Sequence, residues 1–186
     1  YLSYLICPHD SLCFTAYVLS DSGYDVWLGN VRGNKYSQSH ITMLPTDPEF
    51  WNFNLHEIAV LDVPAMIDFV LRTTLKDSLV YVGHALGATY FFAMSSTLPK
   101  YNNKINTMIA LAPIIFMKHL KAPIRNWLIQ YADQNFFDYG LKNNMKHYSS
   151  KTPFSYELDR IHVPVNIFYS ENDLIAGRKV SQLAHK

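Results

Sequence analysis

Short apolar segments alternate with longer segments of helical spacing along this 186-residue chain. The apolar segments with the length and composition of buried strands are Tyr24–Leu28, Ser78–Val82, Ile105–Leu111 and Val163–Tyr169. Alternation of this kind is typical of parallel strands joined by helices. The predicted fold class is therefore α/β, with an open, mostly parallel sheet and helices on both of its faces.

The helical segments have recognisable ends. A helix is expected over Ser11–Ser22, ended by Gly23, because glycine adopts the positive φ of a C-terminal cap. Another is expected over Leu55–Thr74, where Pro64 interrupts the pattern and restarts the helix, since proline fits best in a first turn. The apolar positions of this helix that we expect on one buried face are Ile58, Leu61, Ala65, Phe69 and Leu71.

Two further helices complete the pattern, one from Gly83 to about Thr97 and one from about Gly177 to the end of the chain. Gly29–Trp51 is polar and rich in turn-forming residues, which predicts a long loop. The stretch between Pro113 and Val163 is less regular. It contains helical patterns at Asn126–Tyr131 and Leu141–Tyr148, and aromatic residues that we expect to pack onto the sheet: Tyr131, Phe136, Phe137 and Tyr139.

Composition indicates one globular domain over residues 1–186, with 49 % hydrophobic, 15 % aromatic and 17 % charged residues. The net charge is +1 without a basic cluster, so no nucleic-acid partner is expected. No apolar run reaches the roughly 18 residues of a transmembrane segment. No metal or other cofactor is expected. Cys7 and Cys13 form either a disulfide or two buried thiols, which leaves the compartment open.

Candidate chemistry is concentrated where the strand ending at Val82 runs into Gly83-His84-Ala85-Leu86-Gly87 and a helix follows. This is the frame of the nucleophile elbow, Gly-x-Ser-x-Gly. The central residue of an elbow occupies a strained turn, so the flanking positions must be small, as Gly83 and Gly87 are. The residue after the nucleophile donates its backbone N–H to the oxyanion, a role that Leu86 retains. Alone, this pattern is also compatible with mere close packing of a helix on a strand.

Several other motifs narrow the interpretation. They are Gly23–Asn34, Glu49–Phe53, Asp62–Asp68, Ala110–Pro113, Phe137–Gly140 and Asn144–Tyr148. Together with the elbow they resemble, in the same order and over nearly the whole chain, the acid-lipase family of gastric, lysosomal and insect lipases. The resemblance implies a partial α/β-hydrolase fold and a lipid or ester substrate such as a triacylglycerol or steryl ester. It also implies a secreted or lysosomal location, although the chain, which starts at Tyr1, carries no signal peptide.

The elbow departs from the family pattern Gly-His-Ser-Gln-Gly, because Ala85 replaces the serine and Leu86 the glutamine. Alanine has no atom that can attack a carbonyl. Ser95 and Ser96 lie some 15 Å further along the expected helix by its rise per residue. Removing the nucleophile of a serine hydrolase lowers turnover on the order of 10⁶-fold. The chain is therefore expected to be catalytically inactive.

The resemblance also assigns the rest of the machinery. Asp173, after the last strand, matches the acid that orients the catalytic imidazole. The family histidine falls beyond the last residue, and His185 is not its counterpart, so we expect the triad histidine to be absent. The His-Gly turn of the second oxyanion donor is expected before Tyr1, and the cap is reduced to about 114–136. Restoring serine at position 85 alone is then not expected to restore activity.

Three interpretations remain open at this point. The chain is an incomplete or degenerate lipase, a non-catalytic lipid-binding protein on a lipase scaffold, or an interaction protein whose partner covers exposed sheet edges. Apolar residues near the elbow, namely Leu86, Ala88, Tyr90 and Phe91, suit a lipid site and equally suit a helix packed on a sheet. The pattern of residues therefore does not choose between these interpretations.

Overall fold

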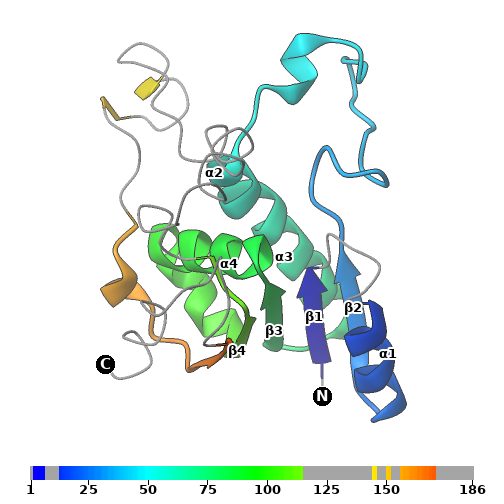
Figure 1. Ribbon diagram of the computed structural model, residues 1–186, viewed down its shortest axis with the longest axis vertical. Coiled ribbons are helices and arrows are strands. Elements are labelled where there is room, and N and C mark those ends of the chain that lie inside the picture. The colour runs from blue at the N-terminus through cyan, green and yellow to red at the C-terminus, as the bar shows by residue number, and fades with distance from the viewer. Residues whose placement is uncertain (1, 7–12, 115–143, 146–149, 152–155, 171–186) are drawn as a thin grey trace.

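A parallel five-stranded sheet organises the chain, with the strand order β2–β1–β3–β4–β5. The computed structural model describes residues 2–6, 13–114, 144–145, 150–151 and 156–170 (Figure 1). Its strands are β1 (Leu2–Ile6), β2 (Asp25–Gly29), β3 (Leu79–His84), β4 (Ile105–Leu111) and β5 (Val165–Phe168). The four strands expected from the apolar segments are confirmed to within about two residues at each end, as is the α/β fold class.

Strand β1 is the element that the apolar pattern missed. It lies between β2 and β3 and pairs with both, as Leu2 with Asp25 and as Ile6 with Gly83. We expected the strand that leads into the second oxyanion turn to lie before Tyr1. The position beside β3, the strand that leads into the elbow, is however occupied by β1. Five residues with a serine among them carry too little periodicity to be recognised as a strand.

The helices follow the expected capping rules. Helix α1 (Cys13–Asp21) ends just before Gly23, whose φ is 87°. Helix α4 (Leu86–Thr97) follows the elbow as expected. The long helical segment starts with a capping box, in which the Asn54 side chain accepts from the His56 N–H at 2.6 Å and Glu57 accepts from the Asn54 N–H at 2.9 Å.

That segment consists of α2 (Leu55–Glu57), a π-helical turn (Ile58–Asp62) and α3 (Val63–Thr74), which confirms the restart at Pro64. The expected buried face is wrong in part. Ile58 and Leu71 are buried as expected, whereas Ala65 is exposed and Leu61 and Phe69 are each 53 % exposed. Other buried positions are Val63, Ile67 and Val70. The π turn takes one residue more than an α turn, so every later position moves round the helix by about one residue.

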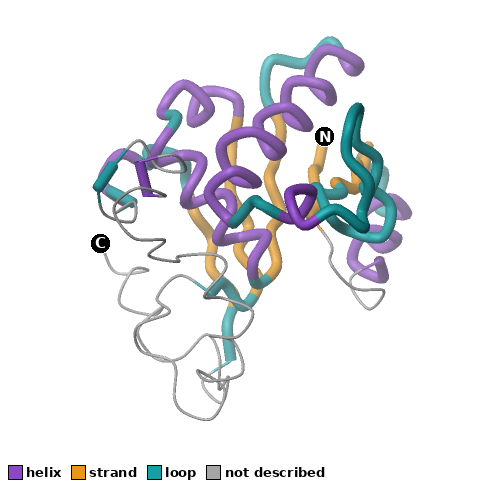
Figure 2. Tube along the Cα trace, turned by 90° about the horizontal axis from the view of Figure 1, so that it is seen from above, coloured by secondary structure: helices purple, strands orange, loops and turns teal. Residues whose placement is uncertain are grey.

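Helices α3 and α4 pack on one face of the sheet, where Tyr81 of β3 and Phe91 of α4 are fully buried with their rings 5.3 Å apart. Ala16 of α1 packs with Val82 on the opposite face. Figure 2 shows the strands with the helices packed beside them. Alternate side chains of β3 therefore pack into two separate hydrophobic clusters, Tyr81 on one face of the sheet and Val82 on the other, as expected for a sheet covered on both faces.

Several expectations fall outside the described residues. They concern the helix at Asn126–Tyr131, most of Leu141–Tyr148, the aromatic residues from Tyr131 to Tyr139, the terminal helix from Gly177 and the cysteine pair. Of Leu141–Tyr148, residues Asn144 and Met145 are described and are helical. Within the described part of the chain, no helix is long and apolar enough to cross a membrane.

Candidate functional site

The turn between β3 and α4 has the geometry of a nucleophile elbow. β3 ends at His84 and α4 begins at Leu86, so the chain reverses at the single residue Ala85. Ala85 has a φ of 48° and a ψ of −113°, the mirror image of an extended L-residue conformation. Glycine adopts this conformation readily, whereas a residue with a Cβ is strained by about 1–3 kcal/mol. The strained turn is thus kept although its side chain is only a methyl group.

Gly83 is required by how closely α4 approaches β3. A Cβ built on Gly83 would lie 2.7 Å from the backbone nitrogen of Ala88 and 2.8 Å from the carbonyl carbon of Gly87. The Gly87 carbonyl also accepts a hydrogen bond of 3.0 Å from the buried Tyr81 hydroxyl. Gly83 therefore allows α4 to pack closely on β3 directly after the strained turn.

Hydrogen bonds to carbonyl groups at the ends of β4 and β5 hold the elbow in place. The Ala85 N–H donates to the Leu111 carbonyl at 3.0 Å. The Thr89 hydroxyl donates to the Ile114 carbonyl at 2.6 Å, just beyond the end of β4. Ala112, with a φ of 44°, donates its N–H to the Phe168 carbonyl at 2.7 Å. The carboxyl ends of β3, β4 and β5 are thus linked directly to one another around the turn.

The oxyanion role expected for Leu86 fits its position. Leu86 is the first residue of α4, and the first N–H groups of a helix have no intrahelical acceptor. The positive end of the helix dipole lies at the same place. Ala85 and Leu86 are both half-buried. A carbonyl oxygen or a carboxylate placed above Ala85 would therefore meet a backbone donor.

The serines that follow on α4 do not replace the missing nucleophile. Ser95 is fully buried and Ser96 is 3 % exposed. The Ser96 hydroxyl donates to the Ala93 carbonyl of its own helix at 3.1 Å. Both side chains belong to the packed body of α4 and not to its N-terminal turn.

The expected second oxyanion donor and triad acid fall outside the described residues, and the structure shows only the strands that precede such positions. β1 ends beside the elbow, since Ile6 pairs with Gly83, but residues 7–12 after it lie outside the described residues. Asp173 follows the end of β5 at Phe168 in the sequence. Asp173 and His185 also lie outside the described residues. Their roles stay predictions from the resemblance.

Among the described histidines, His56 is 9 % exposed. Its Nδ1 lies 3.1 Å from the Tyr156 hydroxyl, and the two rings are stacked. Burial lowers the pKa of His56, and the nearby Glu57 carboxylate opposes that shift. His162 is exposed. His56 therefore links α2 to a distant segment of the chain and is a structural residue.

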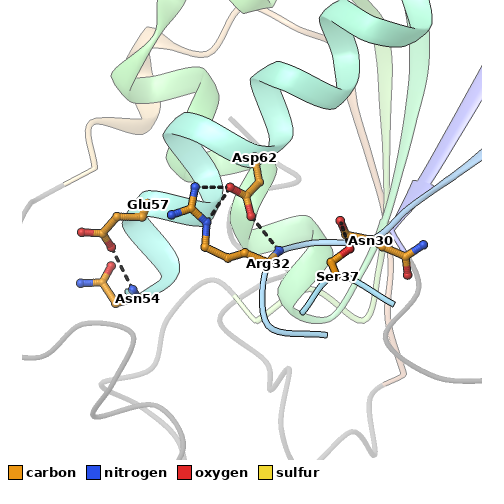
Figure 3. A network of polar contacts seen from close by, with 6 residues as sticks. All are labelled: Asn30, Arg32, Ser37, Asn54, Glu57 and Asp62. Carbon is orange, nitrogen blue, oxygen red and sulfur yellow. Dashed lines mark hydrogen bonds and ion pairs between the residues drawn. The ribbon is translucent and has the colours of Figure 1, made fainter. Parts of the chain in front are cut away.

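An ion pair that sequence reasoning missed fixes the loop after β2. The Asp62 carboxylate accepts from the backbone N–H of Arg32 at 2.8 Å and from its Nε at 2.7 Å (Figure 3). The Asp62 side chain is 9 % exposed, and the Arg32 guanidinium also lies 5.7 Å from the Phe53 ring centroid. Burial and, second, the Asp62 charge raise the pKa of Tyr90 to about 12. Arg32 lies in the motif Gly23–Asn34 and Asp62 in the motif Asp62–Asp68. Membership of these motifs was the sequence signal that could have pointed to the pair.

No cluster of three or more histidine, cysteine, aspartate or glutamate residues suited to a metal ion occurs among the residues that the structure describes.

Comparison with known proteins places these features in context. Residues 8–139 match the model of the alpha/beta hydrolase fold family. The chain is 52 % identical to Lipase 1 of Drosophila melanogaster over 103 residues, which are 55 % of this chain and 24 % of that protein. It is 47 % identical to the gastric triacylglycerol lipase of Bos taurus over 115 residues, which are 62 % of this chain and 28 % of that protein. The match thus spans about a quarter of the length of these relatives.

Solved structures agree on the fold. An extracellular α/β-hydrolase from a Paenibacillus species has a TM-score of 0.58 at 14 % identity, covering 100 % of this chain and 86 % of that one. Est1E from Butyrivibrio proteoclasticus, solved with bound ferulic acid, has a TM-score of 0.60 at 11 % identity, covering 98 % of this chain and 73 % of that one. At such identities the likeness concerns the arrangement of strands and helices alone.

Proposed function

Because this chain belongs to the alpha/beta hydrolase fold family and is similar to several lipases, we propose that it is an acid-lipase-type protein that does not hydrolyse esters. The observation that carries the proposal is Ala85 at the strained turn. Its methyl group stands where the attacking hydroxyl of a serine hydrolase is needed. Loss of that hydroxyl alone lowers the turnover of a serine hydrolase by a factor on the order of 10⁶.

Among the described residues, the hydroxyls of α4 do not supply a substitute. The Thr89 hydroxyl is engaged with the Ile114 carbonyl at 2.6 Å, and Ser95 and Ser96 are buried within α4. An attacking oxygen must also lie within about 3 Å of the reacting carbonyl carbon, at the mouth of the elbow. Residues in the body of a packed helix do not meet that condition.

Binding of a lipid ester or a fatty acid without turnover is the second candidate function. It is favoured by the observation that the elbow keeps its strained conformation, held by the close contact at Gly83 and the bond from Ala85 to Leu111. The N–H of Leu86 is placed to donate to a carbonyl oxygen or carboxylate. The similarity to a triacylglycerol lipase supports neutral lipid esters as the ligand class and a secreted or lysosomal location.

Binding of a partner that covers the sheet edges is a third candidate function, supported by the position of β2 and β5 at the two ends of the described sheet.

Asp173 remains the proposed triad acid, the residue that would orient an imidazole in an active relative.

Hydrolysis is tested directly with the purified chain and p-nitrophenyl esters of short and long acids, from pH 4 to pH 8. We expect the rate with protein to equal the rate in buffer. Turnover above the buffer rate, abolished by Thr89→Val or by another single substitution near the elbow, would contradict the proposal. Circular dichroism of each variant confirms that the fold is intact.

Binding is tested by titration with a fluorescent fatty acid. Leu86→Asp places a negative charge beside the donor, and Leu86→Asn is its uncharged match. We expect the aspartate variant to bind an anionic fatty acid about tenfold or more weakly than the asparagine variant, because like charges repel at short range. Equal affinities would place the ligand elsewhere and remove the second candidate.

A further inference from the structure

A cavity of about 750 Å³ opens at the amino ends of the strands, at the edge of the sheet opposite the elbow. Its wall includes Asp25, the first residue of β2, Leu79, the first residue of β3, and Asn106 at the start of β4. The arrows of β1, β2 and β3 point away from this edge in Figure 1. The end of α3 and the turn that leads into β3 form another side. Small-molecule sites have volumes of about 300–1,000 Å³, so this cavity has the size of a ligand site.

Part of the cavity wall is apolar. Leu79 is 1 % exposed, and Val80 and Trp27 are half-buried. The Trp27 ring is held by Phe69 of α3, which it meets edge-on with ring centroids 6.0 Å apart. A fixed aromatic ring beside aliphatic side chains offers apolar contact without a large loss of side-chain entropy. The apolar part of a ligand is therefore expected at this wall.

The rim of the cavity carries more negative than positive charge. Asp25 and Asp77 are exposed carboxylates, and Lys76 is the only cation among the described lining residues. None of these three side chains forms an ion pair with another described residue. Helix α3 ends beside them, and its last carbonyl groups carry the negative end of the helix dipole. The rim therefore favours a positively charged ligand.

The tryptophan in the wall favours an organic cation over a metal ion. An ammonium group within about 6 Å of an indole ring is attracted by its π electrons, and indole is the strongest aromatic side chain in this respect. A hydrated metal ion would leave the apolar contact of Trp27, Leu79 and Val80 unused. An amine with an apolar body uses both parts of the cavity, the charged rim and the apolar wall.

We propose that this cavity binds an amphipathic organic cation, an amine or quaternary ammonium compound with an apolar body. The ammonium group lies at the rim with Asp25 and Asp77, and the body contacts Trp27 and Leu79. Lys76 weakens binding, because it repels a cation at the same rim. This inference goes beyond the proposed function, since the site lies at the other edge of the sheet and needs neither hydrolysis nor a ligand at Ala85.

The test uses three probes of similar shape and different charge. They are 2-phenylethylammonium, the neutral 2-phenylethanol and the anionic 3-phenylpropionate, each titrated at pH 7 into the ¹⁵N-labelled chain. The readout is the indole N–H resonance of Trp27, assigned by its absence from Trp27→Phe. We expect the ammonium probe to shift this resonance and to bind at least about threefold more tightly than the neutral probe, with the anionic probe weakest. The indole N–H of Trp51, which donates to the Pro45 carbonyl at 2.8 Å in the loop after β2, should not shift.

Charge variants test the rim directly. Asp25→Asn combined with Asp77→Asn should weaken binding of the ammonium probe about fivefold, whereas Lys76→Gln should strengthen it about twofold. The matched control is Glu49→Gln combined with Asp159→Asn. It makes the same change in net charge at two exposed positions outside the cavity lining, and it should bind the probe like the wild type.

Several results would overturn the proposal. One is that the ammonium probe does not bind, or binds no more tightly than the other two probes. Another is that the aspartate double variant and its control lose affinity equally. Binding that leaves the Trp27 resonance unmoved, or that moves the Trp27 and Trp51 resonances together, would also overturn it, because the probe would then lie elsewhere.

Discussion

The Asp62 carboxylate, at the end of the π turn, holds both the backbone N–H and the guanidinium of Arg32, which lies in the loop after β2. The pair joins two segments that are 30 residues apart, and it does so where the Asp62 side chain is only 9 % exposed. A charge-assisted contact with two donors is stronger and more directional than a surface ion pair. The start of the loop after β2 and the start of α3 are therefore fixed to each other.

Replacing Asp62 with asparagine should lower the free energy of unfolding by about 1–3 kcal/mol, because Arg32 is left with a half-buried charge that is poorly paired. Urea denaturation of Asp62→Asn, Arg32→Gln and the double variant gives the coupling free energy between Asp62 and Arg32. The matched control is the exposed pair of Arg160 and Glu157, whose side chains are 55 % and 58 % exposed. Equal couplings for the two pairs would show that Asp62 has no special role in stability.

Ala85→Gly should stabilise the protein by about 1 kcal/mol, since glycine relieves the strain of the positive φ by more than it adds to the entropy of the unfolded chain. Ala88→Gly is the matched control, because Ala88 lies in the body of α4 and is fully buried. The control should be destabilised by about 1 kcal/mol. Thermal unfolding of both variants measures these changes in stability. Destabilisation by Ala85→Gly would contradict a strained backbone at residue 85.

Gly83→Ala should destabilise the protein by about 2 kcal/mol or more, because the new Cβ meets the backbone of α4, which has no room to move aside. Gly23→Ala serves as its control. Gly23 has a φ of 87°, but a Cβ added there would have no atom within 4 Å, so its cost comes from φ alone and should be about 1 kcal/mol. Equal losses of stability in the two variants would argue against close packing at Gly83.

Stability should decrease as the pH falls below about 6.5, the ordinary pKa of histidine. Burial lowers the pKa of His56 in the folded protein, so between the two pKa values the unfolded chain binds more protons. Stability from this group is therefore present above pH 6.5 and is lost as the pH falls towards the folded pKa. His56→Gln should therefore flatten this part of the profile relative to the wild type. Identical profiles for the wild type and the variant would assign the pH dependence to other groups.

The strands and the elbow were predictable because local sequence determines them. Ile105–Leu111 ends in the apolar run Met108–Leu111 and becomes β4 with the same bounds. Gly83 and Gly87 predicted a tight strand-to-helix turn, and the short distances to the backbone of α4 give the reason. The identity of residue 85 then decides the chemistry proposed for the site. The strands follow from periodicity and the small residues of the turn from side-chain size, whereas the interpretation of the turn as an elbow also needed the family resemblance.

Other features depend on contacts between distant residues and could not be read from local patterns. The extra residue of the π turn moved the buried face of α3 away from Leu61 and Phe69. The pairing of Arg32 with Asp62 depends on how the loop after β2 folds back. Strand β1 was missed because its five residues form a strand only when β2 and β3 flank them. Asp173 stays a prediction from the resemblance.

The central place of β1 also constrains the order in which the sheet is assembled. Ser3 pairs with Val26 and with Val80, so β1, which precedes the other described strands in the chain, waits for β3 before its second edge is covered. Closing so long a segment of chain costs entropy before any contact repays it, which slows folding. Until then the edge of β1 is open to other extended chains. During biosynthesis, the strand beside the elbow is therefore the one most in need of protection by a chaperone.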